Sequence, residues 1–207
     1  MNENKLIWKE ESRKNIFGCR VFSIDECSCR SPLDELCSYT VINASDWAII
    51  VPVLESPVSE SPEGRKFVMV RQWRHGSRSL SLEFPGGVFE PGENPQEAAA
   101  RELLEETGFE AGTIVKMGEF SPNPAIMANR VHFFLARGLV DTGRQELDSD
   151  EFVEVELAGV NEVFMGMGKP PYIHALMGSA LILYLQYEKL SFSCPEQSIQ
   201  NNQRNVL

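Results

Sequence analysis

The chain has 207 residues, 43% of them hydrophobic, and its 30 acidic against 19 basic residues give a formal net charge of −11. This length suits one compact domain with extensions, and no stretch approaches the roughly 20 consecutive apolar residues that a membrane span needs. The acidic balance argues against a nucleic-acid-binding surface, so we expect neither nucleic acid nor a membrane as a partner. The first residues lack the apolar core of a signal peptide, which predicts a cytoplasmic protein.

The N-terminal part predicts short strands with turn residues between them, at residues 17–24, 38–43 and 47–54. We expect an N-terminal β extension over residues 1–45, a main domain over 46–190 and a polar tail over 191–207. Four cysteines lie close together in the extension: Cys19, Cys27, Cys29 and Cys37. The chain lacks the CxxC pairs of a zinc knuckle and an even number of cysteines, so we favour reduced, partly buried thiols over zinc or disulfides.

Residues 66–72 alternate apolar and polar side chains, as a half-buried strand does. The end of this segment and the residues after it contain four basic side chains within eight positions: Arg71, Arg74, His75 and Arg78. This basic island in an acidic chain has two interpretations. The arginines are either solvated at an ordinary strand end, or their planar guanidinium groups recognise phosphate or ribose.

The next segment predicts a helix from the residues at its two ends. Asn94 is a favourable N-cap, Pro95 suits the first helical position, and Glu97 completes a capping box. The sequence AAARELLEET contains strong helix formers, and Gly108 suits a left-handed residue that ends the helix. Further strands are expected at residues 112–120, 130–137 and 152–157, and helices at 159–165 and 171–189.

One face of this helix gathers acidic side chains. Glu102, Glu105 and Glu106 fall within an arc of about 100°. We expect the opposite face to pack against the rest of the protein, through Ala100, Leu103, Leu104 and Thr107. Like charges four residues apart weaken a helix, whereas a cation would reverse that effect. Glu93 arrives from the preceding loop, and Arg101 is placed to orient the carboxylates. The alternative is a solvated helix face with no function.

The pattern G-x5-E-x7-R-E-U-x-E-E-x-G-U, in which U is apolar, is met at every position from Gly87 to Phe109. This is the signature of the Nudix hydrolases, and the chain resembles that family. The resemblance implies an α/β (α+β) fold, an α/β/α sandwich around a mixed β-sheet. It also implies hydrolysis of a nucleoside diphosphate linked to another moiety, with two or three Mg²⁺ or Mn²⁺ ions in the site.

The resemblance assigns roles to four residues of this region. Glu102 and Glu106 match the main metal ligands of the family, and Glu105 matches a further ligand or the general base. The carbonyl group of Gly86 matches a backbone ligand to the metal.

The segments RQWRHG and LEFPGG resemble the ADP-ribose pyrophosphatase branch of the family. Arg74 matches an arginine that contacts substrate phosphate, with Arg71 beside it, and Glu83 matches a glutamate that orients ligand or metal. Pro124 matches a proline on a loop facing the substrate, or is an ordinary turn proline. Trp47 is a candidate for stacking on the nucleobase, or it packs in the core. The N-terminal strands of that branch pair two subunits, which implies a homodimer.

The general base stays open at this point. The branch takes a glutamate from a loop just before the strand near residue 152, where this chain offers Asp148 and Glu151, although an acidic loop is commonly just solvated. Glu105 is the other candidate. The expected reaction is Mg²⁺-dependent hydrolysis of a nucleoside diphosphate sugar such as ADP-ribose to a nucleoside monophosphate and a sugar phosphate. Hydrolysis of a dinucleotide or an oxidised nucleotide, and a sensor without turnover, are the alternatives.

Overall fold

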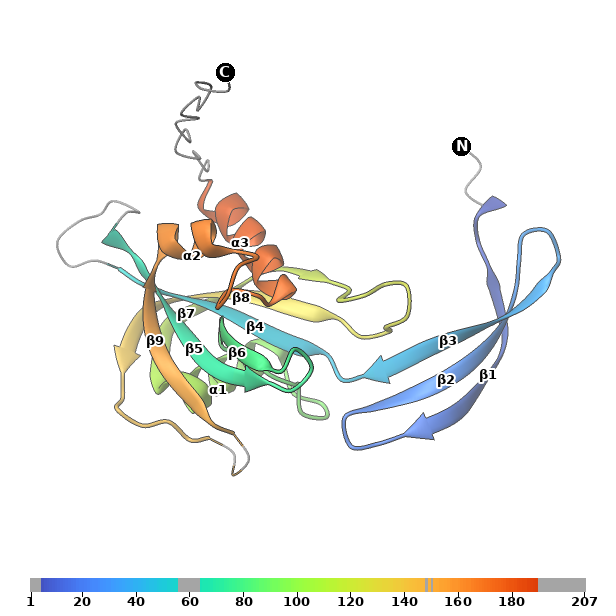
Figure 1. Cartoon of the computed structure of the whole chain (residues 1–207), viewed down its shortest axis with the longest axis horizontal. Helices are drawn as coiled ribbons and strands as arrows, with labels where there is room; N and C mark the ends of the chain where they lie inside the picture. The colour runs from blue at the N-terminus through green and yellow to red at the C-terminus, as the bar shows by residue number, and fades with distance from the viewer. Residues whose placement is uncertain (1–4, 56–63, 148, 150, 190–207) are drawn as a thin grey trace, which may run out of the picture.

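The computed structural model describes residues 5–55, 64–147, 149 and 151–189. Its elements in chain order are β1 (Lys9–Gly18), β2 (Phe22–Arg30), β3 (Leu36–Ala44), β4 (Trp47–Leu54), β5 (Lys66–Arg74), β6 (Ser79–Glu83), α1 (Pro95–Thr107), β7 (Phe109–Phe120), β8 (Val131–Asp141), β9 (Val153–Gly159), α2 (Val160–Gly166) and α3 (Ala175–Glu188). They form the predicted α/β/α sandwich around a mixed sheet, with an N-terminal β extension (Figure 1). The expected tail at 191–207 and the candidate base Asp148 lie outside the described residues.

The main sheet has six strands: five follow the order β6-β5-β4-β8-β7, and β9 pairs with β5 along Lys66–Gln72. Strand β4 runs parallel to β8, with Trp47 opposite Val131, and the remaining pairings are antiparallel. The sheet is therefore mixed, and its only parallel pair within the described residues joins segments far apart in the chain.

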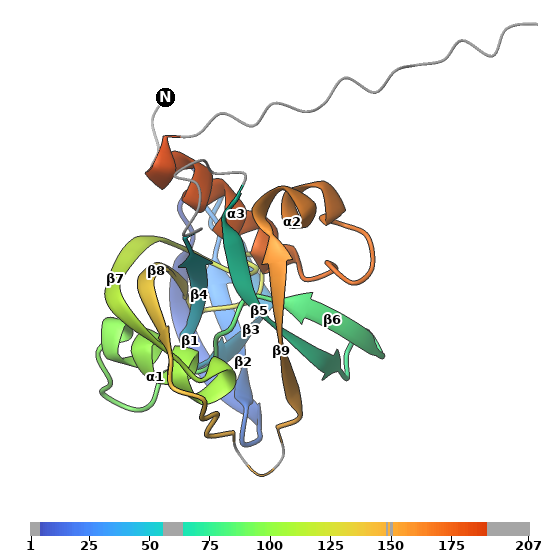
Figure 2. The ribbon, with the colours of Figure 1, turned by 90° about the vertical axis from the view of Figure 1, so that its left-hand side faces the viewer.

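Strand β4 is buried on both faces, and its residues alternate between two apolar clusters. Ile49, Val51 and Val53 join the cluster beneath α2 and α3, whereas Ala48 and Ile50 join the cluster beneath α1. The helices accordingly cover opposite faces of the sheet (Figure 2). This is the period-two alternation of a strand whose two faces both pack.

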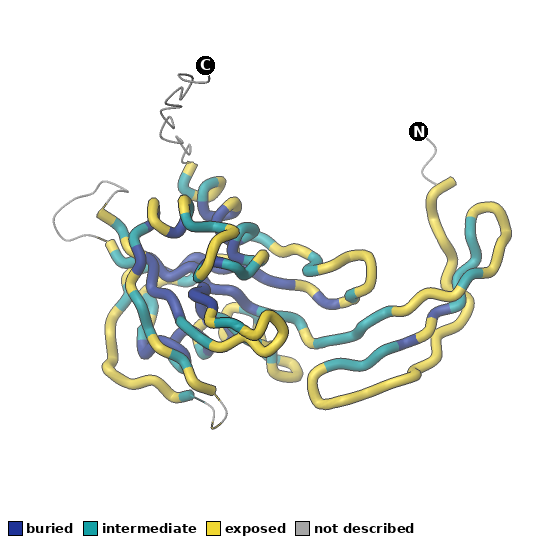
Figure 3. The backbone as a smooth tube through the Cα atoms, viewed as in Figure 1, coloured by how far each residue is buried: buried dark blue, intermediate teal, exposed yellow. Residues whose placement is uncertain are grey.

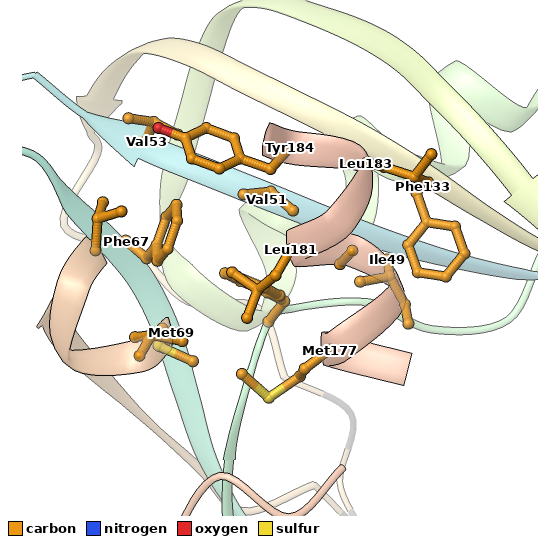
Figure 4. Close-up of a cluster of buried hydrophobic side chains, with 14 of the residues drawn as sticks. Ile49, Val51, Val53, Phe67, Met69, Phe133, Met177, Leu181, Leu183 and Tyr184 are labelled. Carbon is orange, nitrogen blue, oxygen red and sulfur yellow. The ribbon is translucent and has the colours of Figure 1, made fainter. Parts of the chain in front are cut away.

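Aromatic side chains pack among aliphatic ones in the cluster beneath α3, as Phe67, Phe133 and Tyr184 show (Figure 4). The ring of Phe67 meets Phe84 and Tyr184 edge to face, with centroids 5.1 and 5.3 Å apart. Such pairs stabilise a core by about 0.5–1.5 kcal/mol each beyond the burial of their area. The first residues of α3 are tied into the same core through Met177, which is 1% exposed.

The strands β1, β2 and β3 form a separate antiparallel sheet that projects from the sandwich (Figure 1). It joins the sandwich where Ile42 of β3 exchanges backbone hydrogen bonds with Ile126 and Ala128 in the loop between β7 and β8. Much of its surface is exposed (Figure 3). Its cysteines are free thiols, and Cys29 lies opposite Cys37 in the pairing of β2 with β3.

Two predicted elements were wrong in their bounds. The strand expected at residues 17–24 crosses a hairpin turn, because the amide of Cys19 donates to the carbonyl of Phe22 and reverses the chain. The helix expected from residue 171 begins at Ala175, since the carbonyl of Pro171 is held by the amide of Leu82 in β6 at 3.0 Å. Among the described helices, none is long and apolar enough to cross a membrane.

Candidate active site

Helix α1 has the predicted ends. The side chain of Asn94 accepts a hydrogen bond from the amide of Gln96 at 2.9 Å, and Gly108 ends the helix with φ 72°. The expected capping box is not formed, because no hydrogen bond between described residues joins the Asn94 amide to Glu97. The Asn94 side chain and Pro95 therefore start the helix without it.

The acidic face of α1 is turned toward the interior, which differs from the expected packing. Glu102 and Glu106 are only 8% and 5% exposed, and Leu103, which follows Glu102 in the chain, is fully buried. Ala100, which was expected to pack, is exposed, and Leu104 is only half-buried. The helix thus buries carboxylates where apolar residues would have been favourable for stability alone.

The turn after β6 makes room for these carboxylates. The amide of Gly86 donates to Oε2 of Glu106 at 2.8 Å. A Cβ atom on Gly87 would collide with the carboxylate of Glu102, and one on Gly86 would collide with the carbonyl oxygen of Ala48. Gly86 is required by its approach to backbone, and Gly87 lets the carboxylate of Glu102 keep its place. The predicted role of the Gly86 carbonyl as a metal ligand stays a prediction.

Arg101 organises the acidic face. Its Nη1 donates to Oε1 of Glu102 and to Oε2 of Glu105, each at 2.9 Å. Its Nε donates to Oε1 of Glu93, also at 2.9 Å. Arg101 therefore binds three carboxylates at once, and among the described residues its ion pairs do not include Glu97.

Burial makes the two interior carboxylates hard to ionise. It raises the pKa of Glu102 to about 7, despite the ion pair with Arg101. It raises the pKa of Glu106 to about 8, despite the hydrogen bond from Gly86. The negative charge of Glu151, which lies just before β9, raises both values further. The loop of the candidate base therefore lies near this face.

A divalent cation would compensate this buried negative charge. Glu102 and Glu106 fit such an ion through their chemistry, because carboxylate oxygens are the ligands that Mg²⁺ prefers. Across the described residues, however, no three acidic, imidazole or thiol side chains are already gathered around one metal position. Arg101 holds Glu105 beside Glu102, so further ligands would come from substrate oxygens, water or a turned Glu105.

A second charged group lies at the ends of β5 and β6. The guanidinium of Arg74 binds the carboxylate of Glu83 with Nε and Nη2, at 3.0 and 2.7 Å. The Nδ1 atom of His174 lies 2.8 Å from Oε2 of the same carboxylate. Burial alone would raise the pKa of Glu83, but the hydrogen bonds from His174 and Arg74 outweigh it and hold the pKa well below its usual range.

These three side chains line an open pocket of about 330 Å³ together with Gly76, Ser77, Ser81 and Ile173. The charge of Arg74 also lowers the pKa of Glu106. Glu83 ends β6, and the turn directly after it carries Gly86, whose amide binds Glu106, so one short segment joins the two charged groups. Sequence reasoning missed His174, which follows Glu83 by more than 90 positions and stands in no recognisable motif.

The remaining predicted site residues make contacts that do not by themselves show a role in the site. Arg71 pairs with Glu156 of β9, with Nη2 at 2.6 Å from Oε2. Trp47 is half-buried and packs against the core cluster beneath α3. Pro124 lies in an exposed turn of the β7–β8 loop, the loop that hydrogen-bonds to β3. Their contacts with substrate stay predictions.

A family model described as the NUDIX domain matches residues 58–176, more than half of the chain, so the chain belongs to the NUDIX family. It is 44% identical over 91 residues to an ADP-ribose pyrophosphatase of Bacillus subtilis (strain 168), covering 44% of this chain and 49% of that protein. It is 37% identical over 91 residues to a methanol dehydrogenase activator of Bacillus methanolicus, with the same coverage of 44% and 49%. The chain thus spans about half the length of these curated relatives.

A crystal structure of ADP compounds hydrolase matches the fold with a TM-score of 0.76 at 21% identity, over 89% of this chain and 96% of that chain. The structural match extends beyond the residues aligned with the curated relatives and supports the fold of nearly the whole chain. Nudix hydrolases generally use divalent metal ions, in agreement with the buried carboxylates of α1.

Without divalent cations, we expect the free energy of unfolding to fall as the pH rises from about 5 to about 8. An unfolded glutamate loses its proton near pH 4.5, whereas burial raises the pKa of Glu102 to about 7 and that of Glu106 to about 8. Between these values the native state binds more protons than the unfolded state, so the loss is on the order of 2–4 kcal/mol for each of the two carboxylates. Urea unfolding in EDTA across this pH range measures it.

Two comparisons connect that pH dependence to the metal site. Added Mg²⁺ should restore most of the loss at the alkaline end, and Glu106→Gln should flatten the slope in EDTA. The exposed Glu110 at the start of β7 offers a matched control, since Glu110→Gln should leave the slope unchanged. A free energy of unfolding that stays constant with pH in the unsubstituted protein would contradict the argument.

Proposed function

We propose that this chain hydrolyses the pyrophosphate bond of a nucleoside diphosphate sugar, ADP-ribose or a related compound, and releases a nucleoside monophosphate and a sugar phosphate. The observation that supports this most is the pair of buried carboxylates on α1, Glu102 and Glu106, lying beside the Arg74–Glu83 pair. A site that joins acidic metal ligands to a half-exposed guanidinium suits a substrate with two linked phosphates. The likeness to an ADP-ribose pyrophosphatase supports the choice of substrate.

Each part of the site has a task in this reaction. Mg²⁺ or Mn²⁺ ions, two or three with substrate bound, would neutralise the pyrophosphate and lower the pKa of a bound water. Glu102 and Glu106 would hold them, with Glu105 and the Gly86 carbonyl as further candidate ligands. Arg101 keeps Glu102 and Glu105 in place. Arg74 would bind a phosphate oxygen through its exposed edge.

The proton of the attacking water needs an acceptor within hydrogen-bond reach. Glu151 is favoured by its position, because its charge acts on both Glu102 and Glu106. Glu105 is the alternative, and Asp148 belongs to the same loop as Glu151. A carboxylate on that loop could approach the water as substrate binds, without disturbing the ligands held on α1.

The proposed activity is tested with a panel of nucleotide sugars, dinucleotides and oxidised nucleotides, assayed for release of nucleoside monophosphate with Mg²⁺. We expect ADP-ribose to give AMP and ribose phosphate with the highest kcat/KM. Preference for a dinucleotide or an oxidised nucleotide would move the activity elsewhere in the family. Tight binding of ADP-ribose without any release of AMP would indicate a sensor.

Glu106→Gln should lower kcat for the preferred substrate at least about 100-fold, since the carboxylate acts mainly on the transition state through the metal. The amide oxygen of the new side chain can still accept the hydrogen bond from Gly86, so the thermal midpoint should change little. Steady-state kinetics and thermal unfolding measure the two effects. Glu110→Gln serves as control, and near-normal turnover of Glu106→Gln would remove this residue from the site.

We also propose that two copies associate through the N-terminal sheet. That sheet presents large exposed apolar side chains, among them Leu36, which is 58% exposed. Light scattering of the full chain should give the mass of a dimer, and Leu36→Asp should shift it toward that of a single chain. Val140→Asp, at a 63% exposed position on β8, should not. A single-chain mass for the unsubstituted protein at micromolar concentration would exclude the dimer.

A further inference from the structure

We propose that His174 is a positioning residue for this site, one that holds Glu83 so that Arg74 presents a fixed guanidinium edge to the substrate phosphate. The inference rests on the proposed function and adds a residue from α3's N-terminal boundary to a site otherwise built from β5, β6 and α1. His174 acts through Glu83 rather than by touching the reacting atoms.

The geometry places Glu83 between two cationic or hydrogen-bonding partners. Its Oε2 accepts from Nη2 of Arg74 at 2.7 Å and lies 2.8 Å from Nδ1 of His174. The Glu83 side chain is 1% exposed, whereas those of Arg74 and His174 are 44% and 34% exposed. The carboxylate is therefore buried, while its two partners present more of their surface to solvent at the pocket that all three side chains line.

The guanidinium of Arg74 has one edge left for a ligand. Its Nε and Nη2 bind Glu83, while Nη1 makes no hydrogen bond or ion pair with any described residue. A phosphate that binds at Nη1 also attracts the whole group away from Glu83. A buried carboxylate that loses its partner is strongly unfavourable, so a second partner stabilises the arrangement while the arginine engages substrate.

Backbone hydrogen bonds on both sides of His174 hold its segment in place. The carbonyl of Pro171 accepts from the amide of Leu82 in β6 at 3.0 Å, next to Glu83 in the chain. On the other side, the carbonyl of His174 accepts from the amide of Met177 at 3.1 Å, and Met177 is buried in the core (Figure 4). His174 makes no capping hydrogen bond to α3 with its side chain. Its ring is thus directed to Glu83 and is not needed to start the helix.

The test compares His174→Ala with His174→Asn, whose side-chain amide offers a donor near the position of Nδ1. We expect His174→Ala to raise KM for ADP-ribose about tenfold while kcat changes less than about threefold. His174→Asn should keep KM within about twofold of the unsubstituted enzyme. Thermal unfolding of each variant checks that the fold is retained, and His174→Asn keeps the test informative if the alanine variant does not fold.

A double-variant cycle with Glu83→Gln tests the route of the effect. If His174 acts through Glu83, adding His174→Ala to Glu83→Gln should change KM by less than about twofold beyond Glu83→Gln alone. An unchanged KM in His174→Ala, independent effects in the cycle, or no rescue by asparagine would overturn the proposal. Failure of the proposed function would differ, because the unsubstituted protein would then release no AMP from any substrate.

Discussion

Burial of carboxylates on α1 is the constraint from which most of the site follows. Glu102 and Glu106 face the interior at positions that apolar residues would fill more favourably. Gly87 lacks a side chain because Glu102 occupies that space, and the amide of Gly86 is committed to Glu106. Arg101 then compensates part of the charge from the solvent side. The glycine turn, the arginine and the helix form one unit that keeps acidic oxygens in place at a cost in stability.

The buried carboxylates of the site are compensated in two different ways. Glu83 is compensated within the chain by Arg74 and His174, so it stays ionised whatever is bound. Glu106 has a backbone amide and a distant arginine only, and burial raises its pKa to about 8. One half of the site is therefore compensated by groups of the chain itself, whereas a cation from solution would compensate the other half. In the proposed reaction this difference would separate phosphate recognition from metal-dependent chemistry.

The sequence predicted the features of the fold that depend on neighbouring residues in the chain. Pro95 and Gly108 marked the ends of α1, turn residues marked the start of β4, and alternation at residues 66–72 marked β5, because caps, turns and periodicity act over a few residues. The inward orientation of Glu102 and the exposure of Ala100 were not predictable, since they depend on which face meets the Gly86–Gly87 turn. His174 was missed for the same reason: its partner lies in β6, and only the tertiary fold brings the two together.

The parallel pairing of β4 with β8 has a consequence for how the protein is made. Trp47 finds its ladder partner Val131 only after the intervening strands and α1 have been synthesised. Until then β4, which is apolar on both faces, has an unpaired edge in the nascent chain. Exposed apolar strands with unpaired edges are prone to aggregate before folding is complete. A strand that is central and buried in the mature sheet is therefore exposed to misfolding during its synthesis.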